Sequence, residues 1–166
     1  MMDAVHRRAA VWLFVVAAVV WIIDRLTKRW AQGSLPDHPM EVIRGVLTFR
    51  YATNPGGAFS LGGRAPLVFA GATLIICGTI VVTSLRHTRV LPAIAVGLVL
   101  GGGMGNLTDR LLRGPHLTGR VVDFVDFHIW PIFNVADAAI VIGAVLLGLS
   151  TWQRDRPVSR GVTDGA

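Results

Sequence analysis

The chain has 166 residues, 52% of them hydrophobic, and its mean hydropathy is +0.57. This composition excludes an ordinary soluble fold and predicts an integral membrane protein built as one domain. The net charge of +6 comes from 15 arginines and one lysine scattered in short hydrophilic segments, which excludes a nucleic-acid-binding patch and is typical of juxtamembrane anchors. The single cysteine, Cys77, lies in an apolar stretch and indicates neither a disulfide nor thiol chemistry.

Four apolar segments come close to the roughly 20 residues that a helix needs to cross a bilayer. We predict transmembrane helices at about residues 9–30, 66–84, 90–112 and 134–152, joined by long loops at about 31–65 and 113–133. The third segment is rich in glycine, as is usual where transmembrane helices pack closely. The fold class is therefore all-α: residues 1–152 form one bundle of four transmembrane helices, and residues 153–166 form a polar tail.

The first segment has an alternative interpretation as a cleaved signal peptide. Arg7 and Arg8 precede it, and small residues follow at Ala31 and Gly33. Residues 24–30 argue against this, because they are cationic where a cleavage region should be small and neutral.

The basic residues orient the bundle. With the N-terminus inside, residues 1–8, the hairpin 85–89 and the tail hold seven arginines in about 30 residues. The other nine basic residues are spread over about 70 residues of the long loops and adjoining helix ends. Because a high density of basic residues favours the cytoplasm, we predict that both termini are cytoplasmic and that the long loops are extracytoplasmic.

This topology gathers the polar residues of the apolar segments at the extracytoplasmic end. Asp24 and Lys28 are spaced i,i+4 on one face of the first helix. Asn106, Asp109 and Arg110 share one face at the end of the third. An interfacial ion pair or a helix cap would explain each set alone, but a purely structural membrane protein has no reason to gather them at one end.

Two acids stand where a carboxylate is costly to bury. Asp137 lies one turn inside the apolar run that follows Asn134, and an N-cap at Asn134 does not need a second acid there. Asp123 and Asp126 lie in the alternating segment V-V-D-F-V-D-F-H, which predicts a short strand, so only one of them can face Asp137. Neighbouring buried carboxylates share a proton, as in aspartic peptidases. The sequence therefore predicts a membrane-embedded hydrolase that uses Asp123 and Asp137, with Asp126 as the alternative to Asp123.

Other functions remain open from the residues alone. A Ser–Lys dyad would have to pair Lys28 with Ser34 or Ser60. A proton-coupled carrier would need polar groups through the bilayer and out to both faces, and a non-catalytic lipoprotein-binding scaffold would need no acid pair. The histidines lack the spacing of zinc ligands, so no metal site is expected.

Five motifs, taken in chain order, resemble those of the lipoprotein signal peptidase family, also called signal peptidase II. They are D-R-L-T-K (24–28), N-P-G-G-A-F-S (54–60), G-N-L-T-D-R (105–110), V-V-D-F (121–124) and F-N-V-A-D (133–137). The resemblance implies an aspartic endopeptidase of the bacterial inner membrane, with its active site at the extracytoplasmic face. Such an enzyme removes the signal peptide from diacylglyceryl-modified prolipoproteins and cleaves before the lipidated cysteine. The catalytic residues would be Asp123 and Asp137, and the support residues Asp24, Lys28, Asn54, Asn106, Asp109, Arg110 and Asn134.

The resemblance also implies a fold and a set of partners. Four transmembrane helices would carry a small extracytoplasmic β-cradle within residues 33–64, where the strand-like stretch Val42–Tyr51 fits. We expect a monomer that needs no cofactor and whose partners are prolipoproteins and membrane lipids. The loop 128–133, between the two acids, is short for the family and could alter substrate access.

Overall fold

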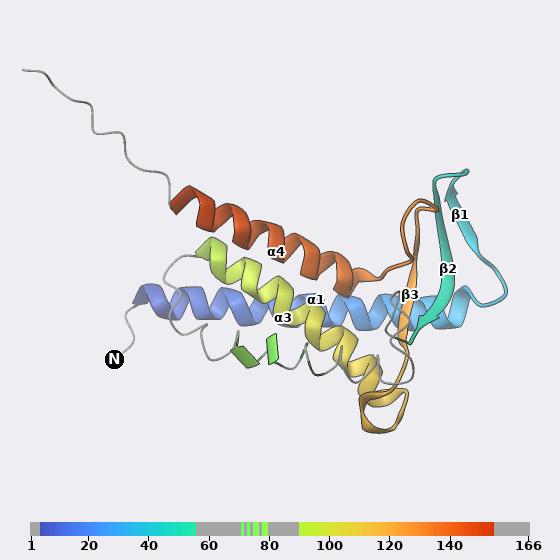
Figure 1. Cartoon of the computed structure of the whole chain (residues 1–166), viewed down its shortest axis with the longest axis horizontal. Helices are drawn as coiled ribbons and strands as arrows, with labels where there is room; N and C mark the ends of the chain where they lie inside the picture. The colour runs from blue at the N-terminus through green and yellow to red at the C-terminus, as the bar shows by residue number, and fades with distance from the viewer. Residues whose placement is uncertain are drawn as a thin grey trace, which may run out of the picture.

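The computed structural model describes residues 4–55, 71, 73, 75, 76, 78, 79 and 90–154. Three long helices, α1 (Ala4–Ser34), α3 (Val90–Leu112) and α4 (Val135–Arg154), pack side by side in this part of the chain (Figure 1). A three-stranded sheet stands at one end of the helices, and a short 3-10 turn at Pro115–Leu117 leads from α3 toward it. The sheet end of the bundle is therefore the end where α1 and α3 finish and α4 begins.

The helices lie at three of the four predicted segments. The stretches Arg7–Ser34 and Val90–Leu112 are long and apolar enough to cross a membrane, and Val135–Ser150 is a shorter apolar helix. Of the predicted helix 66–84, residues 71, 73, 75, 76, 78 and 79 are helical, and the others lie outside the described residues. The helix α4 runs to Arg154, past the predicted start of the tail, whose residues 155–166 are likewise outside the described part.

Glycines let the helices approach backbone to backbone. A Cβ added to Gly101 of α3 would lie 2.5 Å from the carbonyl oxygen of Ala17 in α1. One added to Gly143 of α4 would lie 2.6 Å from the carbonyl oxygen of Ala95 in α3. Any larger residue at these positions would push the helices apart, which agrees with the packing role predicted for the glycine-rich segment.

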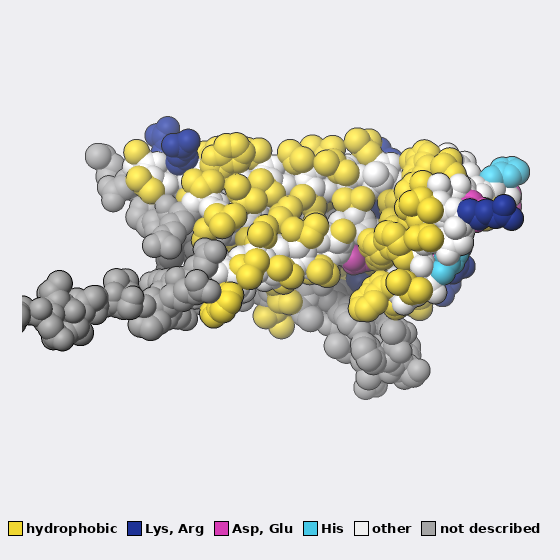
Figure 2. All heavy atoms as spheres, turned by 90° about the horizontal axis from the view of Figure 1, so that it is seen from above, with side chains coloured by type: hydrophobic (Ala, Val, Ile, Leu, Met, Phe, Trp, Pro, Cys, Tyr) yellow, Lys and Arg dark blue, Asp and Glu magenta, His cyan; other side chains and the backbone are white. Residues whose placement is uncertain are grey.

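Apolar side chains cover the flanks of the helices (Figure 2). At the end away from the sheet the interior is also apolar, and its buried cluster consists of Ala9, Leu13, Ala17, Ala93, Val96 and Leu100. Large side chains on the outside of α1 and α4, among them Trp12, Phe14, Val141 and Trp152, are exposed. An apolar outer surface around an apolar interior suits a lipid environment.

The sheet consists of β1 (Met40–Ile43), β2 (Leu47–Asn54) and β3 (Val121–Asp126), paired antiparallel in the order β1-β2-β3. Two expectations for it were wrong. The predicted strand-like stretch Val42–Tyr51 is a hairpin, whose turn contains Gly45 at φ 71° and is closed by a 2.9 Å hydrogen bond from Val46 N to Ile43 O.

The sheet is also not confined to residues 33–64, because β3 comes from the loop before α4. The reason is burial: Val122 and Phe124 of β3 form a buried cluster with Ala31 and Leu35, and Phe49 of β2 packs against it. Trp30 adds edge-to-face contacts with Phe49 and Phe124, at ring-centre distances of 5.7 and 6.0 Å. This cluster fixes β3, and with it Asp123, above the ends of the helices.

Candidate active site

Buried polar side chains gather where the helices meet the sheet. In the described part of the chain they are Asp24, Lys28, Asp109, Arg110, Asp123, Asp126 and Asn134. The opposite end of the bundle has the apolar cluster described above. The predicted one-sided convergence of polar groups is therefore present in the fold, and it brings α1, α3, β3 and the start of α4 to one place.

Asn134 connects the two acids predicted to be catalytic. Its side-chain nitrogen Nδ2 donates to Asp123 Oδ1 at 2.6 Å. Its side-chain oxygen accepts from the backbone N–H of Asp137 at 3.0 Å, and its own backbone N–H donates to Asp137 Oδ2 at 3.3 Å. The last two bonds form a reciprocal capping box at the start of α4. Asp137 therefore takes part in the cap. Capping is not its whole role in the fold, as the sequence predicted, because Asn134 also links it to Asp123.

Asn106 holds the other oxygen of Asp137. Its Nδ2 donates to Asp137 Oδ1 at 2.7 Å. Its Oδ1 accepts from Lys28 Nζ at 2.9 Å and from Asn134 Nδ2 at 3.2 Å. One amide from α3 thus joins the acid of α4 to the lysine of α1.

Lys28 is fully buried between two carboxylates. Its Nζ lies 2.8 Å from Asp24 Oδ2 and 3.0 Å from Asp109 Oδ2. The contact with Asp24 is an ion pair, and Asp24 Oδ1 also accepts from the backbone N–H of Ala136 at 3.1 Å. An ammonium paired in this way is not the neutral amine that a Ser–Lys dyad requires, which argues against that alternative.

Two arginines that the sequence analysis did not select complete the surroundings of Asp109. Arg25 Nη1 lies 2.6 Å and Arg113 Nε 3.0 Å from Asp109 Oδ1. The second oxygen, besides Lys28, accepts from the backbone N–H of Val122 at 3.2 Å, which fastens β3 to α3. Arg113 follows Asp109 at i+4, so the spacing rule that selected Asp24 and Lys28 could have found it. No local pattern marks Arg25.

The environment of Asp123 favours its protonated form. Burial and the nearby negative charge of Asp137 raise the pKa of Asp123 to about 6, against opposing hydrogen bonds from Asn134 and Asn54 and the charge of Lys28. Asn54 stands at the exposed end of β2, where the register brings its strand alongside β3. Asp123 therefore holds its proton up to a higher pH than an ordinary aspartate does.

Asp126 lies away from this pair. Its Oδ2 is 2.5 Å from Arg50 Nε, and its Oδ1 accepts from the backbone N–H of His128 at 2.8 Å. The bond from His128 and the guanidinium of Arg50 hold the pKa of Asp126 below its usual range. The two acids of β3 thus have different partners. Asp123, and not Asp126, is bonded to the asparagine, Asn134, that also binds Asp137.

Arg110 is buried next to the acids on the α3 side. Its Nη1 lies 3.4 Å from the carbonyl oxygen of Gly119, and its charge interacts with those of Asp123, Asp109 and Asp137. All of the predicted site residues, from Asp24 to Asp137, are thus drawn into a single connected cluster.

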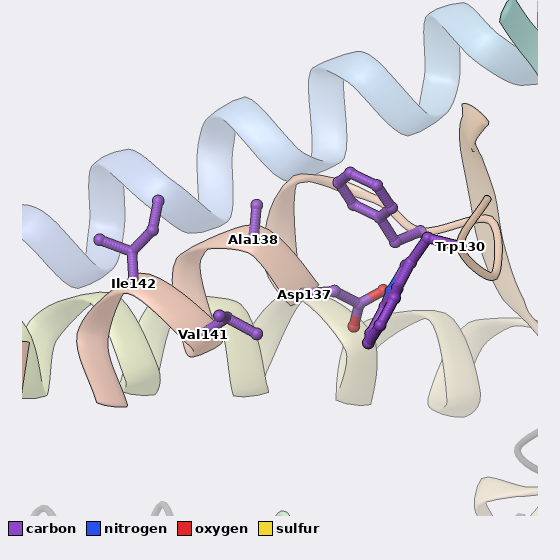
Figure 3. A pocket seen from close by; sticks show the side chains of 6 residues that line it. Trp130, Asp137, Ala138, Val141 and Ile142 are labelled. Atoms are coloured by element: carbon purple, nitrogen blue, oxygen red, sulfur yellow. The ribbon is translucent and has the colours of Figure 1, made fainter. Parts of the chain in front are cut away.

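A cavity of about 380 Å³ opens beside Asp137. Its walls are apolar apart from that carboxylate and come from α4 and the loop before it: Trp130, Phe133, Ala138, Val141 and Ile142. The close-up shows the carboxylate of Asp137 next to the ring of Trp130, with Val141 and Ile142 farther along α4 (Figure 3). Trp130 belongs to the short loop 128–133, and its side chain is 69% exposed. A largely apolar space therefore lies next to Asp137.

Residues 16–153 match the family model described as signal peptidase (SPase) II. The chain belongs to the signal peptidase II family. It is 42% identical to the lipoprotein signal peptidase of Rhodococcus jostii (strain RHA1), over 88% of this chain and 74% of that protein. It is also 40% identical to the lipoprotein signal peptidase of Syntrophomonas wolfei subsp. wolfei, over 78% of this chain and 85% of that protein.

Two solved structures of bacterial membrane enzymes have a similar fold. A bacterial membrane enzyme determined by the in meso method at 2.3 Å resolution superposes with a TM-score of 0.76 and 30% identity, over 90% of this chain and 93% of that chain. A second bacterial membrane enzyme, at 1.9 Å resolution, gives a TM-score of 0.74 at 29% identity. This member of the signal peptidase II family is therefore an integral membrane peptidase of the aspartic class, as the five motifs predicted.

Proposed function

We propose that this signal peptidase II family member removes the signal peptide from diacylglyceryl-modified bacterial prolipoproteins, cleaving before the lipidated cysteine, with Asp123 and Asp137 as its catalytic pair. The observation that carries the assignment is that one residue, Asn134, hydrogen-bonds to both acids. A scaffold that only bound lipoproteins would not need two carboxylates linked in this way. A carrier would need polar groups along the bundle, and the described interior away from the sheet is apolar.

The pair supplies a general base and a general acid. The ionised carboxylate takes a proton from a water molecule, whose oxygen attacks the scissile carbonyl carbon, while the protonated carboxyl donates a hydrogen bond to the carbonyl oxygen. The tetrahedral intermediate then collapses as the C–N bond breaks, and the proton taken from water passes to the leaving amine of the cysteine. Arg110 stabilises the negative charge of the pair. The buried Asn134 holds Asp123, and Asn54, at the exposed end of β2, binds the substrate backbone.

The same arrangement supports a placement in the membrane. We infer four transmembrane helices, with residues 66–84 as the second, cytoplasmic termini and the acid pair at the extracytoplasmic face. The substrate reaches the pair sideways from the bilayer, past the apolar cavity beside Asp137, while its acyl chains stay in lipid. The working unit is one chain, because the described residues of one chain link all the site residues.

The direct test is cleavage by the purified protein in detergent. We expect it to cut a diacylglyceryl-modified prolipoprotein at one bond, and mass spectrometry of the products to place the lipidated cysteine at the new N-terminus. The same precursor without the diacylglyceryl group is the matched control, and we expect it to be cleaved at least about tenfold more slowly, because it loses the apolar binding energy of its acyl chains. Binding of the modified precursor without any cleavage would support the scaffold instead.

The rate of cleavage should fall as the pH rises above about 6. The pKa of Asp123 is raised to about 6, so its proton is present below that pH and lost above it. Once both acids are ionised, the pair lacks its hydrogen-bond donor, and kcat/KM should drop by about tenfold per pH unit. Initial rates between pH 5 and pH 8 measure this. A rate that instead increases up to pH 8 would indicate an amine base, as in a Ser–Lys dyad.

A further inference from the structure

Lys28 determines which groups donate and which accept in the hydrogen bonds that lead to Asp137. An ammonium has three N–H donors and no acceptor. The Nζ of Lys28 lies 2.8 Å from Asp24 Oδ2, 3.0 Å from Asp109 Oδ2 and 2.9 Å from Asn106 Oδ1. The lysine is fully buried, so its donors are directed to groups of the protein. The atom that Asn106 presents to this ammonium must therefore be its carbonyl oxygen.

Asn134 imposes the same orientation on Asn106. Its side-chain nitrogen donates to Asp123 Oδ1 at 2.6 Å and to Asn106 Oδ1 at 3.2 Å. Two donors thus point at one oxygen of Asn106 and exclude the flipped amide. The NH2 group of Asn106 consequently faces Asp137, to which it donates at 2.7 Å.

The result is that the two acids of the pair are not equivalent. Both oxygens of Asp137 accept N–H groups, Oδ1 from the Asn106 side chain and Oδ2 from the backbone of Asn134. Hydrogen-bond donors of this kind stabilise an ionised carboxylate. Asp123 also accepts hydrogen bonds, from Asn134 and Asn54, but it is only 2% exposed and lies beside the Asp137 charge. Burial and that charge outweigh the bonds and favour its protonated form.

We propose that Lys28 is a positioning residue that, through the Asn106 amide, keeps Asp137 as the ionised, water-activating acid and leaves the shared proton on Asp123. The proposal rests on the proposed function, because it assumes that these two acids form the catalytic pair. Other charged groups also surround the pair and stay unchanged in the main test: Asp24 and Arg25 of α1, and Asp109, Arg110 and Arg113 of α3.

The main test is Asn106→Asp, which keeps the shape of the side chain. The new carboxylate still accepts from Lys28 and Asn134, but it has no N–H to give to Asp137. Two carboxylates in contact must share a proton, so Asp137 is no longer a free base. We expect kcat at pH 6 to fall by about 100-fold or more, as for the loss of a general base. We expect KM to stay within about threefold, because the substrate contacts are unchanged.

A second variant addresses Lys28 itself. Asp24→Asn combined with Lys28→Met removes a whole ion pair and leaves no uncompensated charge, since Asp109 keeps Arg25 and Arg113. Asn106 is then free to turn its oxygen toward Asp137. We expect kcat to fall by about tenfold with KM unchanged. The matched control is Arg113→Met, which removes another partner of Asp109 but leaves the contact between Lys28 and Asn106. Its kcat should stay within about threefold of wild type.

Infrared spectroscopy locates the proton independently of cleavage. At pH 5 the wild-type protein should show a protonated-carboxyl C=O band that Asp123→Asn removes and Asp137→Asn retains. In the Asp24→Asn/Lys28→Met protein, part of this band should belong to Asp137, and adding Asp137→Asn should remove that part. A wild-type band that belongs to Asp137 would overturn the proposal even if the Lys28 variants failed to fold.

Kinetics separate this proposal from the function on which it rests. If Asp123→Asn and Asp137→Asn also cleave normally, the catalytic pair itself is wrong. If those two variants are inactive while Asn106→Asp and Asp24→Asn/Lys28→Met keep the wild-type kcat, only the positioning role of Lys28 fails. An equal loss of kcat in Arg113→Met would show that Lys28 is merely structural, and would also overturn the proposal.

Discussion

Changing either Asp123 or Asp137 to asparagine is expected to lower kcat by about 10⁴-fold, because each variant removes one half of an acid–base pair that acts as a unit. For the same reason the double variant should be little worse than the slower single variant. Single-turnover cleavage of a diacylglyceryl-modified prolipoprotein in detergent measures these rates without interference from product release.

Stability should respond differently in the two variants. Asp123→Asn replaces a buried carboxyl whose pKa is raised to about 6, so at pH 7 it removes a charge that the fold keeps at a cost, and the free energy of unfolding should be unchanged or higher. Asp137→Asn leaves only one acceptor oxygen for the N–H groups of Asn106 and Asn134, and should cost about 1 kcal/mol. Thermal unfolding in the same detergent checks both values.

Asp126→Asn is the matched control for the acid pair. It changes the other acid of the same strand, whose partners are Arg50 and His128. We expect its kcat to stay within about threefold of wild type. A protein that loses cleavage on Asp126→Asn and keeps it on Asp123→Asn would reverse the assignment of the catalytic acid.

The helices and the convergence of the site were predictable because they depend on signals that lie close together in the sequence. The apolar stretches around α1, α3 and α4 are long. Each has its polar residues at one end, and because neighbouring helices run in opposite directions these ends lie on the same side of the bundle. Spacing of i,i+3 and i,i+4 selected Asp24 with Lys28, and Asn134 with Asp137, without any tertiary information. The family motifs then named the same residues.

The parts that could not be predicted depend on contacts between distant segments. The alternation in β3 showed that Asp123 and Asp126 point to opposite sides, but only the pairing of β3 with β2 and the cluster around Val122 and Phe124 determine which acid faces α4. Arg25 carries no local pattern because its partner, Asp109, is 84 residues away. The capping-box role of Asp137 was missed for another reason: capping and catalysis look like alternatives in the sequence, although one carboxylate can serve both.

Asp109→Asn is expected to destabilise the fold by about 3 kcal/mol, because it leaves the buried ammonium of Lys28 with Asp24 as its one carboxylate in the described part and takes a carboxylate from Arg25 and Arg113. Asp109 is fully buried and lies 2.6 Å from Arg25, 3.0 Å from Lys28 and 3.0 Å from Arg113. The free energy of unfolding, measured by denaturant titration in detergent, checks the value. Asp126→Asn is again a useful comparison: Arg50 is 51% exposed, and the loss there should be about 1 kcal/mol or less.

The free energy of unfolding lost on Asp109→Asn should also depend on whether Lys28 is present. With Lys28→Met already present, one of the three cations is gone, so Asp109→Asn should cost less than it does in the wild-type protein, and the two changes should fall short of additivity by about 1–3 kcal/mol. If the two losses simply add, Asp109 and Lys28 do not compensate each other. In that case Asp24 alone stabilises the charge of Lys28, and the contact between Lys28 and Asn106 does not require Asp109 of α3.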